Sequence, residues 1–568
     1  MKPITNRKKL LSLLISQALV APAQATVIDV NCGNVTDLIN AINTANSNSD
    51  ADEINLNVDN QANCVYPLTA VNNNRDGANG LPSIYSKLTI NGHRSAIRRQ
   101  EGSERFRILR VASTGNLTLK QLSVENGLNG LNGEGIWHGG GIFNRGELTL
   151  KQSKISGNKA DWFGGGIFNL GKLTLNRSRI DGNTAGEGGG IFNTIATTCF
   201  STTATLTNST VSGNTASDGG GIFNECSIVM LTNSTVAGNT ASFGGGILNY
   251  WYSTTTLTNS TVAGNTARFS AGGIFNHRST VTLTNSTVVE NTVINWNGSN
   301  WSSGGIYNDY QSITTLKNTI LAGNMITTSN SDCFNDVSGI INTNHYNLFG
   351  GDGTECNAGA TDLTLTGLGK TITDVLNPTL ANNGGPTQTL ALVANSPAID
   401  AADDVICPAT DQRGVSRPQG AKCDIGAFEY QKPGLIELGD FQAIATPQGI
   451  YLKWITTSAS DNAGFRLWRA NLDQYGEYTN ITALDNPQAQ TLTATPLEAV
   501  TDWNHLIAAG SSAECYSYLD ASAAPAGTTY FYLLEDVNMG GYRTFHWGNI
   551  VSATVGQNSG GNPQCEDE

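Results

Sequence analysis

The hexapeptide GGGIFN at Gly139–Asn144 decides the fold, because it returns along the chain at a nearly constant spacing. It recurs unchanged at Gly164–Asn169, Gly188–Asn193 and Gly219–Asn224, and then in altered form as GGGILN, AGGIFN and SGGIYN. The final asparagines of successive copies are 24 to 32 residues apart. A period of this length is typical of a solenoid. The aligned positions are Asn144, Asn169, Asn193, Asn224, Asn249, Asn276 and Asn308.

Each repeat contains two further short segments with apolar alternation. In Leu148–Leu150 and Leu173–Leu175, leucine alternates with threonine, and a Ser-Thr-Val segment such as Ser234–Val236 follows in later repeats. Segments that are short, β-branched and bounded by Gly or Asn predict strands rather than helices. Three short strands per repeat predict an all-β fold, a right-handed single-stranded parallel β-helix in which equivalent residues stack from coil to coil.

In this fold the hexapeptide is interpreted as a corner of the coil, not as a catalytic motif. Glycine permits positive φ where the chain turns, and aligned asparagines form hydrogen-bond ladders that satisfy buried polar groups. We expect isoleucine to fill the lumen and phenylalanine to stack on its equivalent in the next coil. The Asn-Ser-Thr triplets that begin at Asn208, Asn233, Asn259 and Asn285 match the N-glycosylation pattern, but their regular register makes them turn residues first.

The beginning of the chain is typical of a secretory signal peptide over residues 1–25. Basic residues precede the apolar run Leu10–Val20, and Ala23–Ala25 matches a small-residue cleavage pattern. Removing its four basic residues changes the formal net charge from −14 to −18, which disfavours nucleic acid as a partner. No other stretch is apolar enough for a transmembrane segment. We therefore expect an exported monomer, secreted or at the cell surface.

Ten cysteines in an exported chain are expected to pair as disulfides. No cysteine or histidine cluster has the spacing of a zinc site, and Asn48, Asp50 and Asp52 lack the glycine and distal glutamate of an EF-hand loop. We therefore expect no metal and no cofactor. Sequence proximity predicts the pairs Cys32 with Cys64, Cys199 with Cys226, Cys333 with Cys356, Cys407 with Cys423, and Cys515 with Cys565.

The regions outside the repeats predict caps and a second domain. Thr36–Asn46 has the pattern of an amphipathic helix with Thr36 as its N-cap, and this helix would cover the open edge of the first coil. Alternating segments after Gly434 predict an antiparallel β-sandwich, which resembles fibronectin type III modules. The predicted order is an N-terminal cap with the first coils at 26–110, β-helix repeats at 111–350, a C-terminal cap at 351–433, the sandwich at 434–556 and a polar tail at 557–568.

An ordered series of short motifs follows the repeats: NGGPT at Asn383–Thr387, SPAID at Ser396–Asp400, DQRG at Asp411–Gly414, Arg417-Pro418, and DIGAFE at Asp424–Glu429. This series resembles the bacterial choice-of-anchor Q family of surface β-helix proteins, and the GGxIxN repeats are similar to those of chlamydial polymorphic outer membrane proteins. Together the two resemblances cover roughly residues 30–430. They imply a secreted or surface β-helix of unassigned activity, and the autotransporter route of the chlamydial proteins is not carried over.

The charged residues of this series have two interpretations. Asp400, Arg413, Arg417, Asp424 and Glu429 resemble a catalytic cluster in composition. Opposite charges in a compact terminal segment more often form a structural network of ion pairs. We favour the ion-paired cap.

Two columns of the repeat hold the candidate site residues. Glu187 and Asp218 each precede a hexapeptide, so they lie on adjacent coils ~4.8 Å apart, a spacing compatible with a retaining glycosidase pair or with two solvated turn residues. One position earlier lies a column rich in aromatic residues. Its members either stack on sugar rings or pack insertion loops against the coils. The aromatic candidates are Trp137, Trp162, Phe269 and Trp301, with Trp296 in a polar insertion loop.

These observations favour a secreted or cell-surface scaffold that binds an extracellular glycan or a protein of a neighbouring or host cell without catalysis. The first alternative is a glycoside hydrolase or polysaccharide lyase that acts in a groove along the β-helix, since fold alone does not decide function. The second alternative is a structural spacer.

Overall fold

A computed structural model describes residues 25–431 of the chain except 49, 131–137, 196–197, 295–301, 328, 337 and 344. Beyond residue 431 it describes 438–456, 462–471, 495–496, 514–520, 523, 526–538, 543–546 and 551–557. Several sequence predictions therefore fall outside the described residues. They concern the signal peptide apart from its last residue, the tail beyond Gln557, Trp137, Trp296, Trp301 and Cys565.

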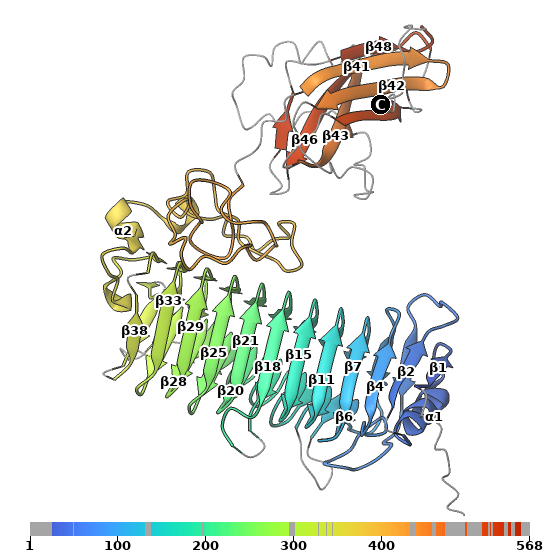
Figure 1. Cartoon of the computed structure of the whole chain (residues 1–568), viewed down its shortest axis with the longest axis vertical. Coiled ribbons are helices and arrows are strands. Elements are labelled where there is room, and N and C mark those ends of the chain that lie inside the picture. The colour runs from blue at the N-terminus through green and yellow to red at the C-terminus, as the bar shows by residue number, and fades with distance from the viewer. Residues whose placement is uncertain are drawn as a thin grey trace, which may run out of the picture.

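The chain winds into a parallel β-helix with three long sheets along its axis (Figure 1), which confirms the predicted fold class. The leucine-threonine segments form the LT sheet, in which each strand pairs with its equivalent one coil away. Its strands are β1 (Val27–Val30), β2 (Ala51–Leu56), β4 (Lys87–Asn91), β7 (Asn116–Lys120), β11 (Glu147–Lys151), β15 (Lys172–Asn176), β18 (Thr203–Thr207), β21 (Ile228–Thr232), β25 (Thr254–Thr258), β29 (Thr280–Thr284), β33 (Ile313–Lys317) and β38 (Ile340–Asn342).

The Ser-Thr-Val segments and their equivalents form the ST sheet. Its strands are β3 (Val65–Leu68), β5 (Ala96–Arg99), β8 (Ser123–Glu125), β12 (Lys154–Ser156), β16 (Arg179–Asp181), β19 (Thr210–Ser212), β22 (Thr235–Ala237), β26 (Thr261–Ala263), β30 (Thr287–Val289), β34 (Ile320–Ala322), β39 (Leu348–Phe349) and β40 (Leu363–Thr364).

The hexapeptides form the IFN sheet. Its strands are β6 (Leu109–Val111), β10 (Ile142–Asn144), β14 (Ile167–Asn169), β17 (Ile191–Asn193), β20 (Ile222–Glu225), β24 (Ile247–Tyr250), β28 (Ile274–His277), β32 (Ile306–Asp309) and β37 (Cys333–Asn335).

Some coils add a fourth short strand that the sequence did not predict. The segment between the Gly-Asn turn and the glycine-rich corner is long enough to extend and pair with its neighbour. These strands are β9 (Leu128–Asn129) with β13 (Lys159–Ala160), and β23 (Thr240–Phe243), β27 (Thr266–Ser270), β31 (Thr292–Val293) and β35 (Met325–Ile326). In the last of these coils, β35 also pairs antiparallel with β36 (Ser329–Asn330).

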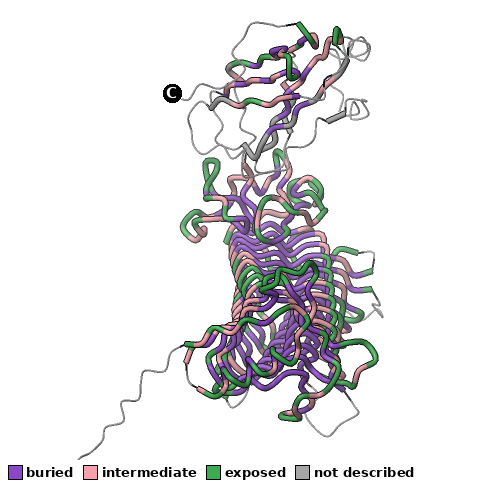
Figure 2. Tube along the Cα trace, turned by 90° about the vertical axis from the view of Figure 1, so that its right-hand side faces the viewer, coloured by how far each residue is buried: buried purple, intermediate pink, exposed green. Residues whose placement is uncertain are grey.

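The register places identical residues on top of one another. In the pairing of β14 with β17, Ile167 lies beside Ile191 and Asn169 beside Asn193. The aliphatic side chains of all three sheets fill one continuous lumen core from Val30 to Cys356, and Figure 2 shows this buried interior along the stacked coils. Each fully buried aliphatic side chain contributes roughly 1.5–3 kcal/mol relative to an exposed one, so the repeated core stabilises the whole stack.

The predicted asparagine ladder is present and buried. The amide Nδ2 of Asn144 donates to Oδ1 of Asn169 at 2.6 Å, and Asn169 donates in the same way to Asn193 at 2.7 Å. Comparable bonds continue to Asn224 and Asn249, and again from Asn276 through Asn308. Between Asn249 and Asn276 the ladder is interrupted, because Nδ2 of Asn249 and Oδ1 of Asn276 have no hydrogen-bond partner in the described structure.

A second buried ladder stands where the sequence predicted only Gly-Asn turns. In each coil, the backbone N–H and Nδ2 of one asparagine both donate to Oδ1 of the next; from Asn214 to Asn239 both distances are 3.0 Å. Nδ2 also donates to a backbone carbonyl one coil back, as Asn214 does to Ile180 at 3.1 Å. The members are Asn158, Asn183, Asn214, Asn239, Asn265, Asn291 and Asn324.

Aspartate replaces asparagine at the end of this second ladder. Oδ1 of Asp332 accepts from the backbone N–H and the Nδ2 of Asn324, at 3.0 and 2.9 Å, and its Oδ2 accepts from the N–H of Gly350 at 3.0 Å. The last rung needs only acceptors, and a carboxylate supplies two. Burial raises the pKa of Asp332 to about 6.

The N-terminal end is covered by α1 (Val35–Ala45), which lies beside the first strands in Figure 1. As predicted, its buried face consists of Leu38, Ala41, Ile42 and Ala45. The N-cap is Asn34 rather than Thr36, because the side chain of Asn34 accepts a hydrogen bond from the N–H of Asp37 at 3.1 Å. No helix of the described residues has the length and apolarity needed to span a membrane.

Four of the five predicted disulfides are confirmed: Cys32–Cys64, Cys199–Cys226, Cys333–Cys356 and Cys407–Cys423. The partner predicted for Cys515 is Cys565, which lies outside the described residues. Disulfides of this number fit an extracellular protein, because reducing compartments keep thiols unpaired.

A 3-10 turn at Thr354–Cys356 precedes β40. The segment after β40 contains α2 (Leu365–Leu368) and a second 3-10 turn, Ile372–Asp374, and is otherwise irregular. It runs back along the outer face of the ST sheet rather than covering only its end (Figure 1). Gln412 links two coils there: its Nε2 donates to Thr235 at 2.8 Å, and its Oε1 accepts from Thr261 at 2.6 Å. A separate apolar core under this segment includes Ile320 and Phe428.

The C-terminal region forms two antiparallel sheets around a core that includes Trp454, Phe465 and Tyr532, as predicted for a β-sandwich. One sheet contains β41 (Leu438–Thr446), β42 (Gly449–Thr456) and β45 (Glu514–Asp520). The other contains β43 (Asn462–Asn471), β44 (Thr495–Pro496), β46 (Thr529–Asn538), β47 (Arg543–Phe545) and β48 (Val551–Thr554).

We expect Asn239→Asp to destabilise the β-helix by about 2–4 kcal/mol. Nδ2 of Asn239 donates to the carbonyl of Val211 at 3.0 Å and to Oδ1 of Asn265 at 2.9 Å. A carboxylate there would face two acceptors without a donor. Urea unfolding at pH 7 measures the effect, with the exposed Asn176→Asp as the matched control. Equal losses in the two variants would contradict a stabilising role for the second ladder.

Candidate binding groove

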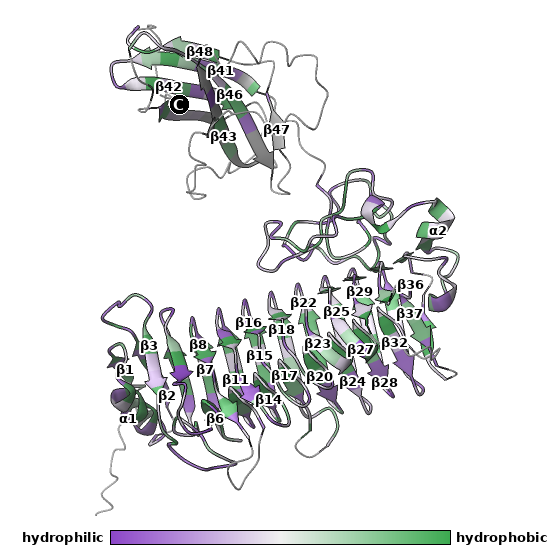
Figure 3. Cartoon of the chain, turned by 180° about the vertical axis from the view of Figure 1, so that it is seen from behind, coloured by the Kyte–Doolittle hydropathy of each residue, from purple (hydrophilic) through white to green (hydrophobic). Residues whose placement is uncertain are grey.

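The outer face of the IFN sheet carries a continuous row of apolar side chains, which are aromatic rings except for Leu248 on β24. Since side chains alternate along a strand, isoleucine and asparagine of each hexapeptide point inward and the phenylalanine between them points outward. The ring centroids of Phe168 and Phe192 are 5.5 Å apart, and those of Phe192 and Phe223 are 4.7 Å apart. In Figure 3 the strands β14, β17, β20, β24 and β28 that carry this row lie side by side. The row forms the floor of a groove.

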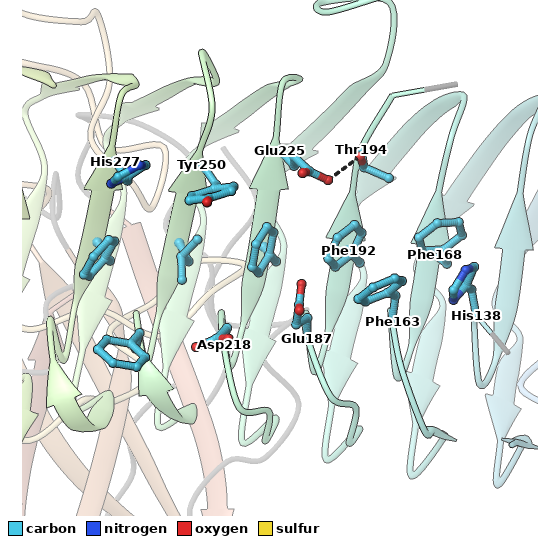
Figure 4. A pocket seen from close by; sticks show the side chains of 14 residues that line it. His138, Phe163, Phe168, Glu187, Phe192, Thr194, Asp218, Glu225, Tyr250 and His277 are labelled. Carbon is cyan, nitrogen blue, oxygen red and sulfur yellow. Dashed lines mark hydrogen bonds between the residues drawn. The ribbon is translucent and has the colours of Figure 1, made fainter. Parts of the chain in front are cut away.

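Two further columns form the walls of this groove, as the three rows of side chains in Figure 4 show. One wall consists of the residues that precede each hexapeptide, which pair from coil to coil: His138, Phe163, Glu187, Asp218 and Phe243. The other wall consists of the residues that follow the hexapeptide: Thr194, Glu225, Tyr250 and His277. The groove has a volume of about 640 Å³. It follows six coils, or five steps of ~4.8 Å, and so extends over roughly 24 Å.

The first glycine of the hexapeptide brings the wall close to the floor. Gly188 has a φ of +62°, and a Cβ at this position would lie 2.8 Å from Cβ of Phe192. Only glycine allows both the left-handed conformation and this close contact without strain. The corner sequence therefore determines the width of the groove as well as the turn.

The carboxylates on the two groove walls lie near one another, and they are partly shielded from solvent. Burial raises the pKa of Glu187 to about 7, and the negative charges of Asp218 and Glu225 add to the shift. Burial also raises the pKa of Asp218. Glu225 accepts a hydrogen bond from the hydroxyl of Thr194 at 2.8 Å. The described residues that line the groove include no lysine or arginine, so ionised carboxylates give this part of the groove negative charge.

A histidine lies at each end of the aromatic row. The ring of His138 packs on Phe163 and Phe168, at centroid distances of 4.7 and 4.6 Å. Burial, together with the positive charge of Arg107, lowers the pKa of His138 to about 4, so its ring is neutral at pH 7. His277 stacks on Tyr250 at 4.9 Å and places its Nδ1 2.8 Å from the carboxylate of Asp309.

Of the two sets of candidate residues predicted from the sequence, the structure places one in the groove and the described members of the other beside it. Glu187 and Asp218 both line the groove. Trp162 and Phe269 flank its wall instead: Trp162 is 50% exposed and packs edge-on against Phe163, while Phe269 is 39% exposed and packs on Phe243. The sequence interpretation missed Glu225, Tyr250 and His277, although their fixed position after each ladder asparagine was a usable signal.

The charged cluster of the C-terminal segment is a structural network in the described residues. Arg417 pairs with Glu429 at 2.9 Å, and Arg413 pairs with Asp411 at 2.8 Å, all with buried side chains. Asp424 accepts from the N–H of Asp400 at 2.8 Å, which joins two loops. None of these residues lines the groove.

Among the residues that the structure describes, no group of three or more His, Cys, Asp or Glu side chains is arranged to hold a metal ion.

No family model matches the sequence, and no curated protein matches it. Among solved structures, the enzymatically active domain of tailspike protein 2 of bacteriophage CBA120 is similar at 9% sequence identity and a TM-score of 0.30. The match covers 94% of this chain and 77% of that one. The resemblances to choice-of-anchor Q and chlamydial proteins stay predictions.

We expect Glu187→Gln to make the protein more stable than the wild type at pH 8 and to change its stability little at pH 4. The folded-state pKa of about 7 exceeds the ordinary 4.5. The folded state therefore binds the proton more tightly, and stability is lost as pH rises through about 7. The gain at pH 8 is about 1 kcal/mol after discounting for solvent in the open groove.

Urea unfolding of both proteins across this pH range measures the difference. The exposed Glu104→Gln is the control, because it removes one carboxylate outside the groove. A difference between wild type and Glu187→Gln that does not grow with pH would show that Glu187 is not desolvated in the groove.

Proposed function

We propose that this protein is an extracellular β-helix scaffold whose groove on the IFN sheet binds a glycan. The observation that carries the proposal is the aromatic floor between two walls that bear Glu187, Asp218 and Glu225. Sugar rings have apolar C–H faces that pack on aromatic rings, and their hydroxyls donate to carboxylates. Both kinds of contact are available along the same groove.

The shape of the groove favours a chain of sugars over a single one. Equivalent side chains recur at every coil, and the groove follows six coils, roughly 24 Å. Hydrogen bonds between coils hold the wall backbone in place, for example from Gly188 N–H to the carbonyl of Asp218 at 2.9 Å. A groove that is already ordered loses little conformational freedom on binding, which supports recognition of an extended oligosaccharide.

The confirmed disulfides support the same proposal, since they fit the oxidising compartments in which extracellular glycans occur. The predicted signal peptide agrees with export. We further propose that the partner is a polysaccharide or glycoconjugate on a cell surface, and that the scaffold acts as a monomer in adhesion.

Hydrolysis of the bound glycan is a second candidate function, which one observation favours. Glu187 retains its proton up to a pH of about 7 and lies one coil from Asp218. A protonated carboxylic acid beside a second carboxylate is the pair that glycoside hydrolysis uses, one as general acid and one as nucleophile or base. Glu187 would be the acid in this scheme.

Glycan binding is tested by titrating the mature protein with oligosaccharides that a glycan array selects. We expect Phe243→Ala with Tyr250→Ala to weaken binding at least tenfold, because both wall rings contact the groove space. Wall residues are preferred to floor residues, whose loss would disturb the stacked row.

The matched control is Tyr85→Ala, since Tyr85 is 39% exposed and lies two coils before the groove begins. Retention of full affinity by the double variant, or equal loss in the control, would show that the groove is not the glycan site. Thermal unfolding of each variant establishes that it is folded.

Hydrolysis is tested with the same oligosaccharides by measuring new reducing ends. If the second candidate is correct, wild-type protein releases them, and Glu187→Gln or Asp218→Asn lowers the rate at least a hundredfold while oligosaccharide binding persists. Bound oligosaccharide that stays intact with the wild type would leave binding as the function.

A further inference from the structure

An exposed cluster of rings around one arginine continues the groove wall at the corner after the IFN sheet. We name it the arginine platform: Trp251, Tyr252, Arg278 and Tyr310. The guanidinium carbon of Arg278 lies 4.9 Å from the ring centroid of Trp251 and 5.2 Å from that of Tyr310. The three rings are 39%, 56% and 52% exposed, respectively. The platform thus combines a fixed positive charge with accessible aromatic surface.

The platform adjoins the groove directly. Tyr250 and His277, which belong to the groove wall, precede Trp251 and Arg278 in the chain. Their rings are also in contact with the platform: Tyr250 packs edge-on against Trp251 at 5.8 Å, and His277 packs against Tyr310 at 5.5 Å. A glycan chain in the groove therefore reaches the platform without leaving the protein surface.

The backbone at the platform is left-handed at each of its four residues. Trp251, Tyr252, Arg278 and Tyr310 all have positive φ, between 41° and 59°. Glycine or asparagine adopts this conformation most readily, and large side chains adopt it at a cost in stability. Other left-handed corners of the chain also carry large side chains, such as Gln152 and Arg177, so the turn tolerates these side chains without requiring them.

Arg278 is arranged to bind an anion. Among the described residues, no carboxylate forms an ion pair with it, whereas the neighbouring His277 is paired with Asp309. Rings pack against the guanidinium, which leaves its N–H edge for a partner. A guanidinium edge matches the two oxygens of a carboxylate or sulfate, and stacking on aromatic rings fixes its orientation.

We propose that the arginine platform is a subsite for an acidic sugar residue, with the carboxylate or sulfate on Arg278 and the sugar ring on Trp251 or Tyr310. This inference rests on the proposed function of the groove. Glu225 lies two coils from His277, a separation of ~10 Å, and carboxylates there repel a uniformly charged polyanion. The structure therefore favours a glycan in which acidic residues alternate with neutral ones.

The test compares matched oligosaccharides by calorimetric titration of the full mature chain. The probes are a uronate-containing oligosaccharide with alternating neutral sugars, the same molecule with its carboxyls reduced to alcohols, and the reduced molecule with sulfate esters. We expect the wild type to bind the uronate or the sulfated form at least tenfold more tightly than the neutral form. The better of the two identifies the anionic group.

Arg278→Gln should bind all three forms equally, and Arg278→Lys should retain only part of the preference, because lysine keeps the charge but loses the planar edge. The matched control is Arg177→Gln, because Arg177 is an exposed arginine at another left-handed corner, with a φ of +48°. This control should keep the wild-type preference. Thermal unfolding establishes that each variant is folded.

The outcomes separate this inference from the function on which it rests. If the wild type binds all three probes equally, or if Arg278→Gln keeps the preference, the platform is not an acidic-sugar subsite. Loss of binding in the Phe243 and Tyr250 double variant would still support the groove in that case. If no oligosaccharide binds the wild type, the glycan-binding function fails and the subsite with it.

Discussion

The hydrogen bond between side-chain amides of successive coils is the constraint on which the rest of the structure depends. An asparagine amide that is buried without partners costs more than the net gain of a surface hydrogen bond. Each coil must therefore present its asparagine at the same height and angle as the previous coil, as Asn214 and Asn239 do. This requirement holds the neighbouring columns in the same register wherever the ladders run. The aromatic floor and the two walls of the groove are consequences of that register.

The sequence predicted the features that follow from the repeat period and those that join residues close together in the chain. The nearly constant spacing revealed the ladder from Asn144, the isoleucines of the lumen and the stacked phenylalanines, and proximity was sufficient to pair Cys32 with Cys64. The second ladder was missed because Asn214 follows a glycine, a pattern that a turn explains equally well. Only its 0% exposure and its two donors show that it is a buried rung. Burial of Asn214 results from the stacking of the coils and cannot be seen in the Gly-Asn dipeptide alone.

The candidate site was predicted in part for a similar reason. Aligning the repeats on one glycine brought Glu187 and Asp218 into a column, but a groove needs a second column and a known distance between the two. That distance depends on the left-handed turn at Gly188 and on the ring of Phe192 beneath it. Contacts across long separations were not predictable either. No period relates Gln412 to Thr235, so the course of the C-terminal segment along the ST sheet was visible only in the structure.

The aspartate at the end of the second ladder makes the two ends of that ladder chemically different. Each asparagine of the ladder donates its N–H groups to the asparagine of the following coil. Any number of such coils can therefore stack with these donors paired. Asp332 accepts from Asn324 and from Gly350 and has no amide to offer onward. Whole coils before Asp332 can be duplicated or lost with every rung still paired, whereas the coil after it, formed by β37, β38 and β39, adds no asparagine to this ladder. Evolution can thus change the number of coils most readily on the N-terminal side of Asp332.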